Sequence, residues 1–218
     1  MTDITESWLL FEDSAHSPQK NMDIDVELLE LSSTFGGRPL LRFYDWDRPS
    51  ASVGYVQKEE IVPDQDKYTV VRRPTGGGVV YHDIDFTYTV VVPKGHWIEK
   101  LDRVESYHVF HRAIVRGLKF FSLECLLADS IATKTDRATM QCFVTPTKYD
   151  VLCTNITPGT TVKVAGSAQR RTKNGILHQG SITLYHLKTD RKTLKKRLKD
   201  AFESEFNISF EPFSMNYC

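Results

Sequence analysis

A run of residues at 72–83, RRPTGGGVVYHD, combines residue types that would suit a bound carboxylate or acyl-adenylate. The consecutive glycines at 76–78 let the backbone approach a ligand closely and offer unshielded N–H donors. Arg73 supplies a charged fork for a carboxylate or phosphate, and His82 adds a titratable group that Asp83 could orient. Three glycines between strands can also be a simple hairpin turn, so this run suggests a site without deciding it.

Lys163 opens a second run, KVAGSAQRR at 163–171. On a strand, Val162 and Val164 face one way and Lys163 the other, so the lysine leaves the core side. A single lysine is usually a solvated surface residue, but this one leads directly into the small residues at 165–168. Those small side chains leave room for a substrate next to the ammonium group.

Cys142 begins a third run, CFVTPTKYD at 142–150, which we expect to be irregular and to precede a strand. A thiol in such a loop is more accessible than that of Cys125, whose neighbours are mainly leucine. The chain has four cysteines and no CxxC pair, which favours free thiols over a disulfide framework or a zinc site. The four are Cys125, Cys142, Cys153 and Cys218.

Basic residues cluster before and on a predicted C-terminal helix. The simplest interpretation is a solvated face, opposite the apolar residues of that helix. The alternative is a surface that docks an acidic partner protein. The cluster comprises Lys188, Arg191, Lys192, Lys195, Lys196, Arg197 and Lys199.

Five segments that cover most of the chain stand in a recognisable order. They are NMDID at 21–25, DRPSASVGYVQ at 47–57, RRPTGGGVVYHD at 72–83, KVAGSAQRR at 163–171 and HQGSI at 178–182. In this order they resemble the lipoate-protein ligase and octanoyltransferase family, whose catalytic domain is shared with biotin ligases. The resemblance implies an α+β domain with a mixed or antiparallel sheet and flanking helices. It also implies acylation of a lysine on a lipoyl domain of 2-oxoacid dehydrogenases or on the glycine-cleavage H protein.

The resemblance implies roles for individual residues as well. Lys163 matches the family lysine that contacts the acyl carbonyl or phosphate. Cys142 looks like the cysteine that octanoyltransferases of the family use at this point, where ligases tend to carry an Asn-Asp pair. The residues that would bind the substrate are Arg73, Thr75, Gly76, Gly77, Gly78, His82, Gly166 and Ser167.

One departure from the family pattern concerns His178. The family places a histidine directly before the glycine of this motif, whereas here Gln179 precedes Gly180. A shift by one residue on a strand turns a side chain to the opposite face of the sheet, so His178 is not carried over as a site residue.

Two reactions share such a scaffold. An octanoyltransferase receives a thioester from acyl carrier protein, and Cys142 would relay the acyl group without a cofactor. A lipoate-protein ligase starts from the free acid and needs ATP and Mg to form an acyl-adenylate. We favour transfer because Cys142 is present and because one helix and a short tail follow residue 182, whereas family ligases commonly need an accessory domain. A third alternative is a non-catalytic relative that only binds lipoyl domains or acyl chains.

The pattern of apolar residues predicts the elements that position these runs. Helices are predicted at 21–29, with Asn21 as N-cap, at 104–121 and at 194–206. The alternation of apolar residues at 22–28 would also suit a strand. Strands are predicted at 39–46, 51–56, 68–73, 85–93, 149–153, 161–165 and 176–184, with a turn at 47–50 and a loop at 129–140. Strand 85–93 alternates large apolar and smaller residues, which is typical of a half-buried strand. Regular strand–helix alternation is missing, and this favours α+β over a doubly wound fold.

The length and composition of the chain exclude several classes of protein. The 218 residues suit one domain over 1–218, and 28 basic residues balance 28 acidic ones. The zero net charge argues against a nucleic-acid-binding protein, and no stretch is apolar enough to cross a membrane. The acidic N-terminus lacks the pattern of a signal peptide, so we expect a cytoplasmic protein that acts on small molecules and a limited patch of a partner protein.

Overall fold

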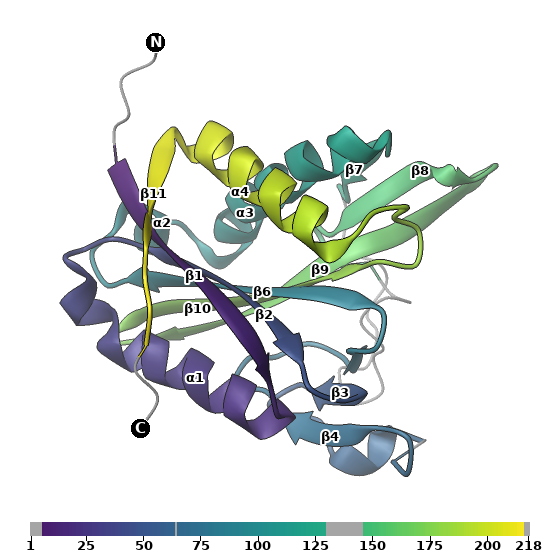
Figure 1. The fold of residues 1–218 in the computed structure, drawn as a ribbon, viewed down its shortest axis with the longest axis horizontal. Helices are drawn as coiled ribbons and strands as arrows, with labels where there is room; N and C mark the ends of the chain where they lie inside the picture. The colour runs from purple at the N-terminus through teal and green to yellow at the C-terminus, as the bar shows by residue number, and fades with distance from the viewer. Residues whose placement is uncertain (1–5, 64, 130–145, 216–218) are drawn as a thin grey trace.

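A large β-sheet, with a smaller sheet beside it, forms the frame of the molecule (Figure 1). The computed structural model describes residues 6–63, 65–129 and 146–215. Along the chain the elements are β1 (Glu6–His16), α1 (Pro18–Glu30), η1 (Leu31–Phe35), β2 (Leu40–Trp46), β3 (Ser50–Val53), η2 (Glu59–Ile61), β4 (Thr69–Arg72), β5 (Val80–Tyr81), β6 (Asp85–Pro93), α2 (Trp97–Lys100), α3 (Arg103–Leu118), η3 (Lys119–Phe121), β7 (Cys125–Leu127), β8 (Val151–Thr157), β9 (Thr160–Thr172), β10 (Gly175–Thr183), α4 (Arg191–Phe206) and β11 (Ile208–Pro212).

The large sheet is mixed and has the strand order β11-β1-β2-β6-β10-β9-β8-β7. Strand β1 runs parallel to β11 and β2, and the remaining neighbours are antiparallel. Helices α3 and α4 cover one face of this sheet, and α1 covers the other (Figure 1). The predicted α+β class, with a mixed sheet and flanking helices, is confirmed.

Strand β6 lies in the middle of the large sheet and is buried along its whole length. Its large residues, such as Phe86 and Tyr88, pack in the core under α3 and α4. Val91 packs in the second core beneath α1, and the hydroxyl of Thr89 donates to Oδ2 of Asp25 on that helix at 2.8 Å. The prediction of a half-buried strand is wrong, because α1 covers the face that the smaller residues occupy.

Helix α1 is present as predicted but begins earlier. Ser17 is its N-cap and accepts a hydrogen bond from the backbone N–H of Lys20, while Pro18 occupies the first turn. Asn21, the predicted cap, is buried, and its side-chain amide donates to the carbonyl oxygen of Asp45 at 2.9 Å. This bond anchors the helix to the end of β2.

The strands predicted at 39–46 and 51–56 belong to different sheets. β2 joins the large sheet, whereas β3 pairs in parallel with β4 and antiparallel with β5. The turn predicted at 47–50 therefore carries the chain from one sheet to the other. The glycine run at 76–78 lies between β4 and β5, so the small sheet positions it.

Strands β1 and β11 were not predicted, and they pair with each other in parallel at the edge of the large sheet. Trp8 of β1 is fully buried against Phe202 and Phe206 of α4. Asn207, in the left-handed conformation with φ of 54°, ends α4 and leads the chain directly into β11. Strand β1 is therefore held in place by long-range contacts of Trp8, and the local pattern of apolar residues does not predict it.

The other predicted helices and strands are present with shifted ends, as α3, α4, β4 and β8 to β10. The predicted loop at 129–140 lies outside the described residues, apart from its first residue. Among the described helices, none combines the length and the apolar character needed to span a bilayer.

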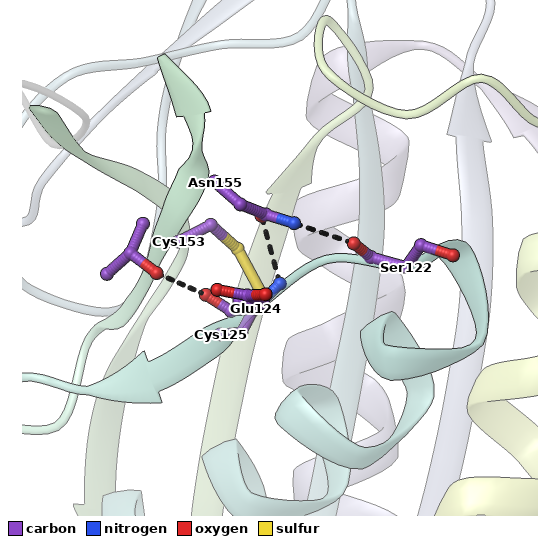
Figure 2. The surroundings of a disulfide bond; sticks show 6 residues. Ser122, Glu124, Cys125, Cys153 and Asn155 are labelled. Atoms are coloured by element: carbon purple, nitrogen blue, oxygen red, sulfur yellow. Dashed lines mark hydrogen bonds between the residues drawn. A yellow bond between two sulfur atoms is a disulfide. The ribbon is translucent and has the colours of Figure 1, made fainter. Parts of the chain in front are cut away.

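Cys125 and Cys153 form a disulfide bond between β7 and β8 (Figure 2). The two residues lie directly opposite each other in the antiparallel register, with their Cα atoms 4.2 Å apart. The expectation of free thiols is wrong for this pair, because strand pairing brings together two cysteines that are 28 residues apart in sequence. Cys142 and Cys218 lie outside the described residues.

We expect the disulfide to contribute about 3 kcal/mol to stability, because it closes a long loop of the unfolded chain. Urea unfolding of Cys125→Ser should show a decrease of that size in the free energy of unfolding, relative to the oxidised wild type. Wild-type protein treated with a thiol reductant should unfold near the midpoint of the variant. Equal midpoints for Cys125→Ser and the oxidised wild type would contradict this prediction.

Candidate active site

A cavity of about 580 Å³ lies between the large sheet, the small sheet and the start of α3. Apolar and aromatic side chains contribute much of its wall, among them Met22, Tyr44, Trp46, Val80 and Tyr107. Most of the predicted site residues line it as well, and these are Arg73, Gly76, Gly77, His82, Lys163, Gly166 and Ser167. Thr75 and Gly78 belong to the same glycine loop but lie behind its lining.

Lys163 is buried in the cavity wall and forms an ion pair with Asp150. Its Nζ lies 2.7 Å from Oδ2 of Asp150, and both side chains are only 3% exposed. The same oxygen accepts hydrogen bonds from the backbone N–H and the hydroxyl of Thr147, at 2.6 and 3.0 Å. A carboxylate held in this way compensates the lysine charge, which burial alone would disfavour.

Gly166 leaves space for this ion pair. A Cβ atom at this position would lie 2.8 Å from Cε of Lys163 and 3.1 Å from Oδ1 of Asp150. A larger residue would push the pair apart, so this small residue makes room for the lysine as well as for a substrate.

Arg73 supports the glycine loop through hydrogen bonds to backbone carbonyls. Its Nη2 donates to the carbonyl oxygens of Gly76 and Gly78, both at 2.6 Å, and its Nη1 donates to that of Ser52 at 2.9 Å. Gly77 has a φ of 88°, a left-handed conformation that favours glycine. The predicted contact of Arg73 with a substrate carboxylate or phosphate would require some of these bonds to open.

His82 is held between polar side chains at the cavity wall. Its Nε2 lies 2.8 Å from Oγ of Ser52, and its Nδ1 lies 2.8 Å from Oδ2 of Asp85. The sequence suggested Asp83 as the orienting group, but that carboxylate accepts a hydrogen bond from a tyrosine hydroxyl instead. Asp85, the first residue of β6, orients the ring in its place.

Thr75 and Gln179 connect the glycine loop to a buried ion pair. The hydroxyl of Thr75 donates to Oε1 of Gln179 at 2.7 Å, and Nε2 of Gln179 donates to Oδ2 of Asp25 at 2.7 Å. The other oxygen of Asp25 accepts from Nη1 of Arg42, also at 2.7 Å. Burial by itself would lower the pKa of Arg42, but neighbouring charges, that of Asp25 foremost, raise it, so the guanidinium stays charged.

The sequence carries little signal for this connection. Asp25 lies in the segment at 21–25 that carries part of the family resemblance, and its place on the sheet side of α1 is the one available signal. A buried charge on a helix needs a partner, but the sequence does not say which of many distant residues supplies it.

His178 and Gln179 face opposite sides of the large sheet, as the order of the two residues predicts. Gln179 lines the cavity, whereas His178 is fully buried among Tyr107, Phe110 and His111. Burial lowers the pKa of His178 well below its ordinary value. The His178 ring is therefore neutral near pH 7.

Ser167 has a partner that the sequence did not reveal. Its Oγ lies 2.7 Å from Nε2 of His111, whose Nδ1 lies 2.5 Å from the carbonyl oxygen of Tyr149. A carbonyl oxygen can only accept, so Nδ1 of His111 carries the proton and Nε2 accepts from the serine hydroxyl. Burial lowers the pKa of His111, which favours this neutral form.

Cys142, the predicted nucleophile, lies outside the described residues. The residues that follow it in the same sequence run reach the cavity, since Thr147, Lys148 and Asp150 all line it. The role of Cys142 therefore stays a prediction.

Comparison with known proteins agrees with the fold. Residues 17–215 match the family described as the lipoyl protein ligase A/B catalytic domain. The chain is 36% identical over 220 residues to Octanoyltransferase LipM of Anoxybacillus flavithermus, and 34% identical over 219 residues to Octanoyltransferase LipM of Bacillus cereus. Each alignment covers 92% of this chain and 76% of the relative.

Solved structures of lipoate ligases share the fold. A putative lipoate protein ligase from T. acidophilum with bound lipoic acid has a TM-score of 0.72 at 19% identity, over 96% of this chain and 90% of that one. Lipoate-protein ligase A bound with ATP has the same TM-score and coverage at 18% identity. As the resemblance in its motifs implied, the chain belongs to the lipoyl protein ligase A/B catalytic domain family.

Proposed function

We propose that this chain is a protein-lysine octanoyltransferase, formed by one catalytic domain over residues 1–218. Relatives at 30–36% identity are named octanoyltransferases, and they support octanoyl transfer over ligation. The structural observation that carries the proposal is the buried pair of Lys163 and Asp150 in the wall of a largely apolar cavity. Such a cavity suits an eight-carbon chain, and the pair supplies a cation where a thioester carbonyl would gain negative charge.

The reaction consists of two acyl transfers. In the first, the thiolate of Cys142 attacks the thioester of octanoyl-acyl carrier protein, a new C–S bond forms, the old one breaks, and the carrier thiol leaves with the proton that Cys142 lost. In the second, the amine of the acceptor lysine attacks the octanoyl-cysteine, an amide bond forms, the C–S bond to Cys142 breaks, and the amine proton passes to the departing Cys142 sulfur. Each tetrahedral intermediate carries negative charge on oxygen, which the ammonium of Lys163 offsets.

The substrate-binding residues divide into those that face the acyl group and those that hold the loop. The first group lines the cavity directly, and it comprises Gly76, Gly77, His82, Gly166 and Ser167. Arg73 also lines the cavity, but it and Thr75 act through the loop by their hydrogen bonds, to which Gly78 contributes a carbonyl oxygen. The glycines then bring backbone N–H groups close to the ligand.

Partners and cofactors follow from this reaction. The acyl donor is acyl carrier protein, and the acceptor is a lipoyl domain of a 2-oxoacid dehydrogenase or the glycine-cleavage H protein. No cofactor is required, because the carrier thioester is already activated, whereas ligation of free lipoate would need ATP and Mg. The cytoplasm is the compartment we assign to the enzyme.

Intact-protein mass spectrometry tests the proposal. Enzyme mixed with octanoyl-acyl carrier protein and no nucleotide should gain the mass of one octanoyl group, and should lose it when an unmodified lipoyl domain is added. A lipoyl domain that is acylated only when lipoate and ATP are supplied would support ligation instead. Acylation under neither condition would support a non-catalytic binding protein.

A further inference from the structure

The cavity carries more positive than negative charge. Among the described residues that line it, five are lysine or arginine, and one, Asp150, is a carboxylate. The whole chain, by contrast, has 28 of each sign. An excess of one sign in a cleft concentrates ligands of the opposite charge. The five cations are Arg73, Arg103, Lys148, Lys163 and Arg170.

Three of these cations have no carboxylate partner in the described part of the chain. Lys163 is in its own ion pair, and Arg73 donates to the carbonyls of the glycine loop. Salt bridges are common elsewhere on the surface, but none of the described ones includes Arg103, Lys148 or Arg170. Their charges are therefore available to an incoming anion.

Aromatic rings hold two of these three cations. Cζ of Arg170 lies 5.6 Å from the ring centroid of Tyr55, and Nζ of Lys148 lies 4.8 Å from that of Tyr149. Contact with a ring face orients a cation without neutralising its charge. The N–H groups at the edge of such a cation can still donate to anionic oxygens.

The three cations line the same cavity, whose wall includes the start of α3. Arg103 is the first residue of α3, after its cap Asp102. Arg171, the neighbour of Arg170 on β9, donates to the carbonyl oxygen of Asp102 at 3.3 Å, so this part of β9 lies against the start of the helix. Tyr149, the residue after Lys148, donates from its hydroxyl to Oε1 of Glu105 in the first turn of α3 at 3.3 Å, so the segment that carries Lys148 also lies against the start of the helix.

The carboxylates near this point already have partners. Asp102 accepts from the backbone N–H groups of Val104 and Glu105, at 2.7 and 2.9 Å. Glu105 accepts from the hydroxyl of Tyr149 at 3.3 Å and lies 3.6 Å from Nδ1 of His108. The three cations that line the cavity outnumber these two carboxylates, so the net charge here stays positive.

The spacing between Arg170 and Lys163 suits a long, flexible acyl carrier. Lys163 and Arg170 lie on the same strand, β9, and their Cα atoms are separated by about 23 Å at the usual rise of a strand. A pantetheine arm has about thirteen bonds between its sulfur and its phosphate, or about 15 Å at the rise of an extended peptide. The side chains of Lys163 and Arg170 are long and extend toward the ligand, and they make up the difference between the Cα separation and the length of the arm.

We infer that Arg103, Lys148 and Arg170, here termed the basic mouth, bind the phosphodiester of the pantetheine arm that carries the acyl group. The inference rests on the proposed function and adds a recognition element to it. The acyl carbonyl lies beside Lys163, and the phosphate stays at the basic mouth. Guanidinium and ammonium groups form charge-assisted hydrogen bonds with phosphate oxygens. Nucleotide phosphates share this chemistry, and the experiment separates the two sources.

Two small donors test the inference on the full chain, with a lipoyl domain as acceptor. Octanoyl-4′-phosphopantetheine carries the phosphate, and octanoyl-pantetheine lacks it. The wild type should use the phosphorylated donor with a kcat/KM about tenfold higher or more, because charge-assisted bonds to the phosphate form with that donor alone. In the double variant Arg103→Gln/Arg170→Gln, the ratio of the two kcat/KM values should fall toward one.

Arg112→Gln is the matched control, because Arg112 is an exposed arginine of the same helix that pairs with Glu205 and does not line the cavity. It should keep the wild-type ratio. Arg103→Lys/Arg170→Lys restores the charges and should recover part of the ratio. Lys148→Gln, measured alone, should lower the ratio too, and it keeps the inference testable if the double variant does not fold.

Several outcomes would overturn the inference. A wild-type ratio near one, or a ratio that survives in the double variant, overturns it, while transfer from octanoyl-acyl carrier protein would still support the proposed function. If ATP binds the wild type and not the double variant, and the donor ratio is the same in both, the basic mouth serves a nucleotide. Failure of every donor without nucleotide would remove the proposed function and the inference together.

Discussion

Cys142→Ser should abolish both the octanoyl-enzyme and transfer to the lipoyl domain, or slow both steps greatly. A thioester on the enzyme conserves the activation that the carrier thioester brings, and a cysteine thiolate can form one. A serine hydroxyl at the same place has no base to make it a competent nucleophile. Intact-protein mass spectrometry after mixing with octanoyl-acyl carrier protein, without nucleotide, should therefore show no adduct on the variant.

Cys125→Ser and Cys153→Ser are the controls for this result. The two sulfur atoms are bonded to each other between β7 and β8, so neither acts as a nucleophile in the oxidised protein. Each single variant leaves the other thiol in apolar surroundings, which disfavour the thiolate form. Both variants should keep the octanoyl adduct. ATP-dependent lipoylation that survives Cys142→Ser would replace the transferase with the ligase.

Elements with a strong local pattern could be predicted from the sequence. Helix α3 follows from apolar residues at steps of three and four, and β6 follows from its alternation. The glycine loop and Lys163 could be singled out because unusual residue types stand together in short runs. These signals lie within about a dozen residues, so they do not depend on the rest of the fold.

The partners of the site residues could not be predicted, because they come from distant parts of the chain. Asp25 and Gln179 are 154 residues apart, yet their side chains are in direct contact. Asp85 rather than Asp83 orients His82, and this choice depends on where β6 begins. Several carboxylates near in sequence were equally plausible partners, and only the packing selects among them.

The two wrong expectations about exposure and thiols have a similar cause. The pattern of β6 was right, but what covers its second face is a helix that precedes it by more than fifty residues. Cys125 was expected among apolar neighbours and Cys153 at the end of a strand, but their bond depends on the register of β7 against β8. A local sequence pattern predicts that a strand forms, but it does not predict which segments lie beside that strand, because pairing depends on residues far apart in sequence.

The structure also explains why two glycine-containing motifs occur together. A Cβ atom at Gly54 would lie 2.1 Å from the carbonyl oxygen of Gly77, so the segment at 47–57 and the glycine loop fit closely against each other. The resemblance to the family includes both segments, but it gives no reason for their joint presence. Their contact shows that the backbone after β3 forms one side of the loop that lines the cavity.

Lys163→Met should lower the rate of octanoyl transfer by about 10²–10³, the usual effect of removing one donor to a developing oxyanion. Methionine keeps most of the volume of the lysine stem, so the core packing is preserved. The change also leaves the buried carboxylate of Asp150 without its ammonium partner, which would destabilise the fold by about 3–5 kcal/mol. Single-turnover transfer and thermal unfolding should therefore be measured on the same preparation.

The double variant Lys163→Met/Asp150→Asn separates the two effects. Asparagine keeps an acceptor for the hydrogen bonds from Thr147 and removes the unpaired charge, so stability should recover in part. The transfer rate should not recover, because no ammonium is present to offset the charge on the carbonyl oxygen. If the rate returns with the stability, the role of Lys163 is structural. Wild-type activity in the single variant, with its fold confirmed, would remove Lys163 from the mechanism.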